Sequence, residues 1–279
     1  MKPRAMKYRL NAMETAGALM VLGLAFVAIF APWLAPYDPT RAVAHSFGDP
    51  AAPSRMYLLG TDQLGRDVLS RIIYGARISL TVGVAAMLIT MTIGVSIGLS
   101  AGFFGGAIDF ALMRFTDVML TLPALLLAMA FVAVLQPSIL SILLVIGLVS
   151  WTQIARVVRA EALSMTQRDF VLAARALGAP SGRLIVRHVM PNVMPIIVVM
   201  AVLGTSSTLL LDAGLSFLTL GVPPPTPSWG RMIEEATAYF RMAPWLAIFP
   251  GLAIFYAVLG FNLLGYGFLR RRSRADTAL

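Results

Sequence analysis

The sequence contains no cysteine and only two histidines, and charged residues make up 13% of its 279 residues. The lack of cysteine excludes disulfides and thiolate metal sites. Soluble domains are usually about one-quarter charged, so the low share of charge argues against a water-soluble protein. The only two lysines, Lys2 and Lys7, lie near the start of the sequence and outside any glycine-rich loop. A nucleotide-binding P-loop needs a lysine inside such a loop, so we predict no ATP hydrolysis by that route.

Hydrophobic residues make up 58% of the sequence, and many of them form long apolar runs. A helix that crosses a bilayer needs about 20 mostly apolar residues. Six stretches meet this requirement, at about 14–35, 78–103, 108–135, 138–158, 192–220 and 245–269. We therefore predict an all-α integral membrane protein with six transmembrane helices. The first stretch is too long for a signal peptide and lacks a clear Ala-x-Ala cleavage site, so we predict an uncleaved anchor.

The net charge of +9 would suit a nucleic-acid partner, but the basic residues flank the apolar stretches, which is typical of membrane topology. We therefore predict no nucleic-acid partner and a chain in contact with the lipid bilayer. Six spans place both termini on one side of the membrane. Of the 22 lysines and arginines, 15 fall on that side and seven on the other. The excess predicts that both termini are cytosolic.

Two predicted outer segments carry possible helices. In the first, at about 36–77, Thr61 or Asp62 is placed to cap an amphipathic helix. Its apolar face is predicted to contain Leu64, Val68, Leu69, Ile72 and Ile73, and its polar face Arg66, Asp67, Ser70 and Arg71. We expect this helix to lie in the outer membrane interface, and we favour a structural cuff over a role in ligand contact. In the second, at about 221–244, several prolines precede a short helix at about 231–240, whose Glu234 and Glu235 either meet a soluble partner or face solvent.

A basic segment at about 159–191, here called the elbow, connects the fourth and fifth predicted spans. Asp169 is a plausible N-cap for a short helix, and Gly178 is suited to the left-handed conformation that ends one. The apolar stripe of this helix consists of Phe170, Ala173, Ala174 and Leu177, and the surrounding arginines are Arg168, Arg175, Arg183 and Arg187. The predicted inner loops are otherwise short and offer little to pack against. We therefore favour a partner interface, with the helix lying in a groove of another protein, over packing within the chain.

Few residues in the sequence indicate where a transported solute would cross the membrane. Asp212, late in the fifth predicted span, is the main candidate, because an acidic residue inside a membrane usually faces a cavity or a partner. Pairing with an arginine or with a partner protein is an equally good interpretation of Asp212. Weaker candidates are Gln136, Ser206, Ser207 and Thr208. The two histidines, His45 and His188, fall in different segments, so we predict no metal site.

The elbow has a spacing that resembles the EAA loop of ABC-importer permeases, which reads Glu-Ala-Ala, three residues, Gly, nine residues, and then Ile-x-Leu-Pro. Here Ala173 and Ala174 precede Gly178 by the same interval, and nine further residues lead to a segment that ends at Pro191. Leu172 replaces the glutamate. Further segments are similar to the second, C-type permease of the dipeptide, oligopeptide and nickel branch, at 59–67, 74–80, 102–106, 215–218, 224–230 and 261–265. The resemblance covers about residues 14–268.

The resemblance implies a type I ABC-importer permease fold with a cytosolic coupling helix, in the plasma membrane of a bacterium or an archaeon. It divides the chain into an N-terminal tail, first span and outer segment at 1–77, a permease core at 78–269 and a basic tail at 270–279. The implied coupling residues are Ala173, Ala174 and Gly178, with Phe170 and Leu177 as apolar anchors and Pro191 at the end of the motif.

The implied partners are a homologous second permease, two cytosolic ATPase subunits or domains and an extracytoplasmic substrate-binding protein. ATP and Mg would bind the ATPases, so we expect neither a cofactor nor catalysis on this chain. The expected cargo is a di- or oligopeptide, with nickel or another small solute as the alternative. A secondary carrier that acts alone is the competing class, but it predicts paired charges or inverted repeats inside the membrane, and neither is evident.

Overall fold

The computed structural model describes residues 11–44, 48–135 and 138–276. All regular secondary-structure elements in these ranges are helices. Within those ranges the only β-type pairing is an isolated bridge between Thr61 and Asp67. The helices are α1 (Ala12–Ile29), α2 (Ala31–Leu34), α3 (Val68–Phe104), α4 (Gly106–Thr121), α5 (Ala124–Val134), α6 (Ile139–Thr166), α7 (Asp169–Ala176), α8 (Ser181–Leu184), the π-helical η1 (Ile185–Val189), α9 (Met190–Phe217), α10 (Trp229–Ala236), the 3-10 helix η2 (Thr237–Tyr239) and α11 (Trp245–Asp276). The predicted all-α membrane fold is confirmed.

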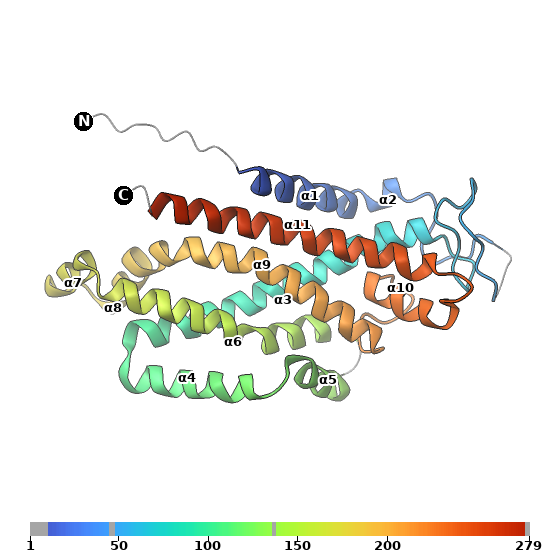
Figure 1. Cartoon of the computed structure of the whole chain (residues 1–279). Coiled ribbons are helices and arrows are strands. Elements are labelled where there is room, and N and C mark those ends of the chain that lie inside the picture. Colours follow the sequence, from blue (N-terminus) through green and yellow to red (C-terminus); the bar gives the residue numbers. More distant parts are fainter. Residues whose placement is uncertain (1–10, 45–47, 136–137, 277–279) are drawn as a thin grey trace.

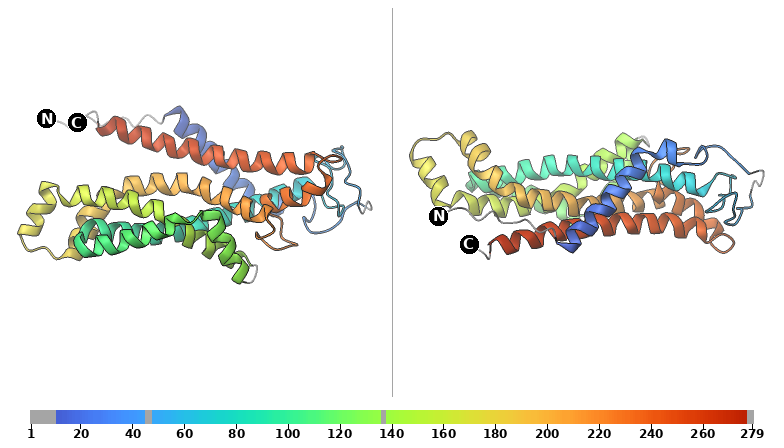
Figure 2. Two further views of the ribbon diagram at one scale, coloured as in Figure 1. Left: turned by 60° about the horizontal axis from the view of Figure 1, so that its bottom comes forward. Right: turned by 90° about the horizontal axis from the view of Figure 1, so that it is seen from above.

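Five of the helical segments are long and apolar enough to cross a membrane, and α4 with α5, bent by 87° relative to each other, makes a sixth candidate span. The helices α3, α6, α9 and α11 run roughly along one direction (Figure 1), and α1 crosses α11 obliquely (Figure 2). The helix α3 packs against both α6 and α9, and α11 packs against α1 and α9. The short helices α7 and α8 lie at one end of this bundle, here called the elbow end, and α10 lies at the other, with the loop that precedes α3. Figure 2 shows the same separation of the two ends from two further directions.

Glycines allow α3 and α6 to approach closely. Gly94, Gly98 and Gly102 follow one another at intervals of four, so they share a face of α3. A Cβ atom at Gly98 would lie 2.6 Å from the backbone oxygen of Ala155, and one at Gly102 would lie 2.6 Å from that of Arg159. Small residues at this spacing are typical of tightly packed membrane helices, where backbone proximity supplies van der Waals contact.

The structure differs from the sequence prediction at the second and fifth spans. The helix α3 is continuous from Val68 to Phe104, so the expected interfacial helix and the expected span from 78 form a single element. The fifth span begins well before residue 192, because helical structure continues from Ser181 to Phe217 through a π turn. Pro191 lies just after this π turn and has no N–H to donate to it.

The third span is broken where the sequence reads Leu122-Pro123. Pro123 has no N–H to donate to the preceding turn, and Leu122 adopts an extended conformation with φ −91° and ψ 130°. A residue before proline is pushed out of the helical region by contact with the proline ring, so α4 ends here. The helix α5 then starts at Ala124 in a different direction.

Candidate functional site

The elbow helix α7 ends in a Schellman motif. Gly178 has a φ of +81°, as the sequence predicts, and its N–H donates to the carbonyl of Arg175 at 3.0 Å. The N–H of Ala179 donates to the carbonyl of Ala174 at 3.1 Å. These two bonds satisfy carbonyls that the end of a helix leaves without partners. The predicted N-cap is wrong, because Arg168 holds that position without a side-chain bond and Asp169 lies in the first turn of α7.

The inner face of the elbow is fixed to the helix bundle. Val171 on α7, Leu184 on α8 and Val189 are buried, and Leu184 and Val189 belong to a core cluster that contains Phe103 of α3. The guanidinium of Arg175 lies 5.5 Å from the centre of the Phe103 ring, in a cation–π contact. The elbow is therefore positioned to move together with the spans.

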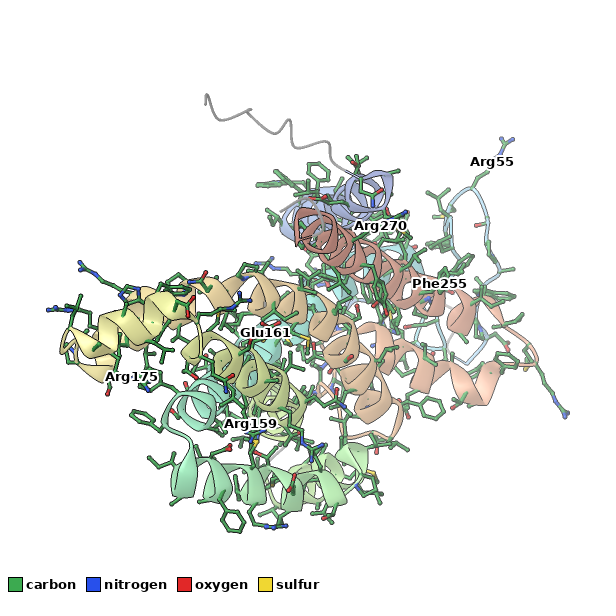
Figure 3. All side chains as sticks on the ribbon, turned by 60° about the vertical axis from the view of Figure 1, so that its left-hand side comes forward. Arg55, Arg159, Glu161, Arg175, Phe255 and Arg270 are labelled. Atoms are coloured by element: carbon green, nitrogen blue, oxygen red, sulfur yellow. The ribbon has the colours of Figure 1, made fainter. Side chains whose placement is uncertain are left out.

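The outer face of the elbow exposes apolar side chains, although the ring of Phe170 also contacts that of His188, with centroids 6.3 Å apart. Leu177 is 89% exposed and Phe170 is 45% exposed. Ala173 is exposed too, whereas Ala174 packs against the core, so the predicted apolar stripe is divided between the two faces. The four arginines around it are all exposed, and Figure 3 shows Arg175 at this end of the molecule. They are Arg168, Arg175, Arg183 and Arg187. An apolar patch with a charged rim is typical of a protein–protein interface.

Two other predicted positions flank this face. Leu172, at the place of the motif glutamate, is 46% exposed and brings an apolar side chain where the motif has a carboxylate. Pro191 is exposed at the start of α9. Neither position is in the buried core.

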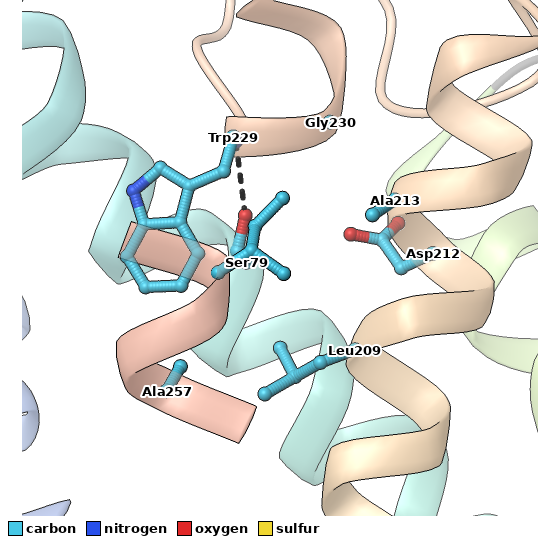
Figure 4. A pocket seen from close by; sticks show the side chains of 8 residues that line it. Ser79, Leu209, Asp212, Ala213, Trp229, Gly230 and Ala257 are labelled. Atoms are coloured by element: carbon cyan, nitrogen blue, oxygen red, sulfur yellow. Dashed lines mark hydrogen bonds between the residues drawn. The ribbon is translucent and has the colours of Figure 1, made fainter. Parts of the chain in front are cut away.

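Three of the residues predicted to line the translocation path, Asp212, Ser206 and Ser207, face different surroundings. Asp212 on α9 is 1% exposed, and its Oδ1 has no hydrogen-bond partner among the described residues. In Figure 4 its carboxylate points from α9 toward Ser79 of α3, which accepts a hydrogen bond from the backbone N–H of Trp229. Ser206 is buried, and its hydroxyl lies 3.5 Å from the carbonyl oxygen of Val258. Only Ser207 of the three lines a sizeable cavity, so the structure does not bring them together at one site.

That cavity has a volume of about 650 Å³ and lies between α6, α9 and the break between α4 and α5. Its polar lining includes Ser150 and Gln153 of α6, which sequence reasoning missed. The signal available in the sequence is the polar run at 150–153 inside an apolar span. Of the weaker path candidates, Thr208 is buried and donates to the carbonyl of Gly83 at 2.9 Å, while Gln136 lies outside the described residues, as does His45.

A network of ion pairs lies at the end of the bundle opposite the elbow; it joins the buried Asp62, Arg66 and Arg71 to the half-buried Glu235, which also pairs with Arg231 at 3.3 Å. Nε of Arg66 lies 2.6 Å from Oδ2 of Asp62, and its Nη2 lies 3.0 Å from Oε2 of Glu235. Nη1 of Arg71 contacts the same Asp62 oxygen and lies 2.8 Å from Oε2 of Glu235. The network joins the loop before α3 to α10, across 169 positions in the sequence.

The prediction that the interfacial helix turns its polar face toward water is therefore wrong. Its expected polar face, Arg66, Asp67, Ser70 and Arg71, is buried, whereas Leu64 of the expected apolar face is 40% exposed. The helix starts later than expected because Asp67 is the cap, and its Oδ2 accepts from the N–H of Ser70 at 2.8 Å. Burial of the two arginines is tolerated because carboxylates from two segments compensate them.

Acid is expected to weaken this network. Burial by itself raises the pKa of Glu235, but the guanidinium groups of Arg71 and Arg66 outweigh it and hold that pKa below its ordinary value of 4.5. A carboxylate with a lowered pKa stabilises the fold fully above its unfolded-state pKa, and the gain is lost as pH falls through the folded-state value. The melting temperature of the wild type should thus exceed that of Glu235→Gln at pH 7, and the gap should shrink below about pH 4.5. A gap that stays constant down to pH 3 would contradict this assignment.

The five long apolar helices and the bent pair α4–α5 define a multi-pass membrane protein with an exposed helical elbow at one end. Comparison with known proteins gives the family. Residues 94–274 match the family of binding-protein-dependent transport system inner membrane components, and residues 7–53 match the N-terminal transmembrane domain of oligopeptide transport permease C. The chain therefore belongs to the family of inner-membrane permeases of binding-protein-dependent ABC importers.

Relatives within this family cover most of the chain. The di/tripeptide transport system permease protein DppC of Pseudomonas aeruginosa is 43% identical over 90% of this chain and 84% of its own length. The dipeptide transport system permease protein DppC of Alkalihalophilus pseudofirmus is 38% identical over 92% of this chain and 84% of its own length. The glutathione transport system permease protein GsiD of Escherichia coli is 42% identical over 94% of this chain and 86% of its own length. The predicted family and subunit type are thus confirmed.

Proposed function

We propose that this chain is the second permease subunit of an ATP-driven importer for short peptides and forms half of its translocation path. The cargo class, which spans dipeptides, tripeptides and glutathione, rests on the transport functions for which the relatives are named. In this proposal the chain pairs with a homologous permease and receives cargo from an extracytoplasmic binding protein. ATP and Mg bind two separate ATPase subunits, and the chain itself carries out no catalysis.

The exposed outer face of the elbow is the observation that supports coupling to an ATPase. Its apolar anchors Phe170 and Leu177 are held at a fixed distance from the spans by the buried Val171 and Leu184. Motion of a partner that binds Phe170 and Leu177 is then transmitted to the membrane-spanning helices. This assignment places the elbow and both termini in the cytosol and the loop end outside. The helix ends of α1 and α11 that lead to the termini point toward the elbow end, in keeping with this orientation (Figure 1).

The experiment that tests this function is transport by the purified complex. An affinity tag on this chain, expressed in its source organism, should recover a second permease and ATPase subunits. After reconstitution in vesicles with the binding protein, the complex should accumulate a labelled dipeptide only when ATP is supplied on the elbow side. Accumulation by this chain alone, driven by an ion gradient, would instead identify a secondary carrier.

A further inference from the structure

Two adjoining cavities lie beside α6 and α9 and share three polar side chains. The larger has a volume of about 650 Å³ and the smaller of about 200 Å³. Ser150, Gln153 and Ser207 line both of them. No charged side chain of the described residues lines either one.

The broken span indicates that the larger cavity faces water, cargo or another protein rather than lipid. Leu122 and Pro123, at the break between α4 and α5, form part of its wall. The break leaves carbonyls of the last turn of α4 without helical partners. Irregular backbone at membrane depth is tolerated where it lines an aqueous cavity or is buried in protein, because lipid offers no hydrogen bonds.

The shared side chains have free hydrogen-bonding capacity. No described residue forms a hydrogen bond with the side chain of Ser150, Gln153 or Ser207, and Gln153 is exposed toward the cavities. In the smaller cavity the hydroxyl of Thr90 is buried, at 1% exposure, and has no partner among the described residues.

The chemistry of this set matches an amide backbone. Gln153 offers two N–H donors and a carbonyl acceptor, and each serine hydroxyl donates and accepts. Ser150 and Gln153 lie three residues apart on one face of α6, and Ser207 faces the same cavity from α9. A peptide bond presents one donor and one acceptor, which such groups satisfy whatever side chains it carries.

We infer that Ser150, Gln153 and Ser207 form an uncharged strip that hydrogen-bonds the peptide backbone in transit and does not discriminate between charged cargo side chains. This inference rests on the proposed function, because it names how this chain contacts the proposed cargo. It assigns to these three residues a binding role for secondary amide groups.

The test is uptake of Ala-Ala, Lys-Ala and Glu-Ala by the reconstituted complex. Gln153→Leu should lower the maximal rate for all three peptides by the same factor, about tenfold, which corresponds to the loss of roughly one hydrogen bond. Gln153→Glu places a charge in the strip and should lower the rate for Glu-Ala relative to Lys-Ala about fivefold or more compared with the wild type. Ser207→Ala should lower all three rates by a smaller factor, on the order of threefold.

The matched control is Ser96→Ala. Ser96 lies on α3, donates to the carbonyl of Thr92 at 2.7 Å and lines neither cavity, so its loss should leave uptake within about twofold of the wild type. A Glu-Ala to Lys-Ala ratio that Gln153→Glu leaves unchanged, or a Ser207→Ala rate equal to that of the control, overturns the inference alone. A wild-type complex that accumulates none of the three peptides with ATP refutes the proposed function, and the inference falls with it.

Discussion

Replacing Asp62 by alanine is expected to destabilise the loop end of the protein strongly, by about 3–5 kcal/mol. The Asp62 carboxylate accepts from the backbone N–H groups of Leu64 and Arg66 at 2.9 Å each. It also pairs with the side chains of Arg66 and Arg71, both of which are buried. Its loss leaves these two guanidinium groups with only Glu235, which also pairs with Arg231. Breaking a buried ion pair from one side leaves an uncompensated charge.

Thermal unfolding in detergent and limited proteolysis of the loop before α3 measure this effect. The matched control is Asp38→Ala, because Asp38 also pairs with an arginine in the same loop but does so on the surface, at 3.4 Å from Arg41. The control should change the melting temperature and the cleavage rate far less than Asp62→Ala does, since it removes only an exposed ion pair and two exposed hydrogen bonds from Thr40. Equal melting temperatures for Asp62→Ala and the wild type would show that the network does not hold the loop to α10.

The second large effect is expected at Leu177, where replacement by serine should reduce ATP-driven uptake about tenfold or more without lowering the stability of the chain. Leu177 is 89% exposed, so the isolated fold loses almost no contact when the side chain is shortened. If a partner buries it, the substitution removes about 2 kcal/mol of docking energy. Uptake, ATPase activity and recovery of ATPase subunits with the tagged chain should be measured together. Transport should fall relative to ATP hydrolysis.

Two further variants distinguish loss of docking at the elbow from a nonspecific effect of substituting an exposed residue. Gly178→Leu should also uncouple transport while membrane insertion stays intact. No atom lies within 4 Å of a Cβ built at Gly178, so the leucine causes no clash. Its left-handed backbone conformation costs roughly 1–2 kcal/mol of strain. We expect this strain to redirect the chain after α7. Met242→Ser, at a 67% exposed methionine near the opposite end, is the control and should keep wild-type coupling. Wild-type uptake in both elbow variants would contradict the coupling role.

The local features of the elbow are predictable from the sequence, and its division into two faces is not. The left-handed Gly178 follows from a rule that involves only a helix end and the residue after it. Whether Ala174 or Ala173 faces inward depends on where Phe103 and Val158 lie, and those residues come from other helices. The exposure of Leu177 therefore needs the structure.

The buried network shows where sequence reasoning reaches its limit. The local sequence predicts a polar, solvated face for Arg66 and Arg71, because it shows only a mixture of apolar and charged residues. Their second carboxylate comes from Glu235 on α10, far along the chain, and only that partner makes burial possible. The break at Leu122-Pro123 lies between these cases: the proline is visible in the sequence, but the 87° bend and the cavity beside it are not.

The most direct test of the coupling role is the identity of the neighbour of residue 177 in the assembled complex. The chain has no cysteine, so Leu177→Cys gives a single thiol on the outer face of the elbow. A bifunctional thiol reagent should crosslink this position to an ATPase subunit, and a membrane-impermeant maleimide added to intact cells should leave it unlabelled. Labelling of intact cells, or a crosslink to the extracytoplasmic binding protein, would place the elbow on the wrong side of the membrane and contradict the coupling role.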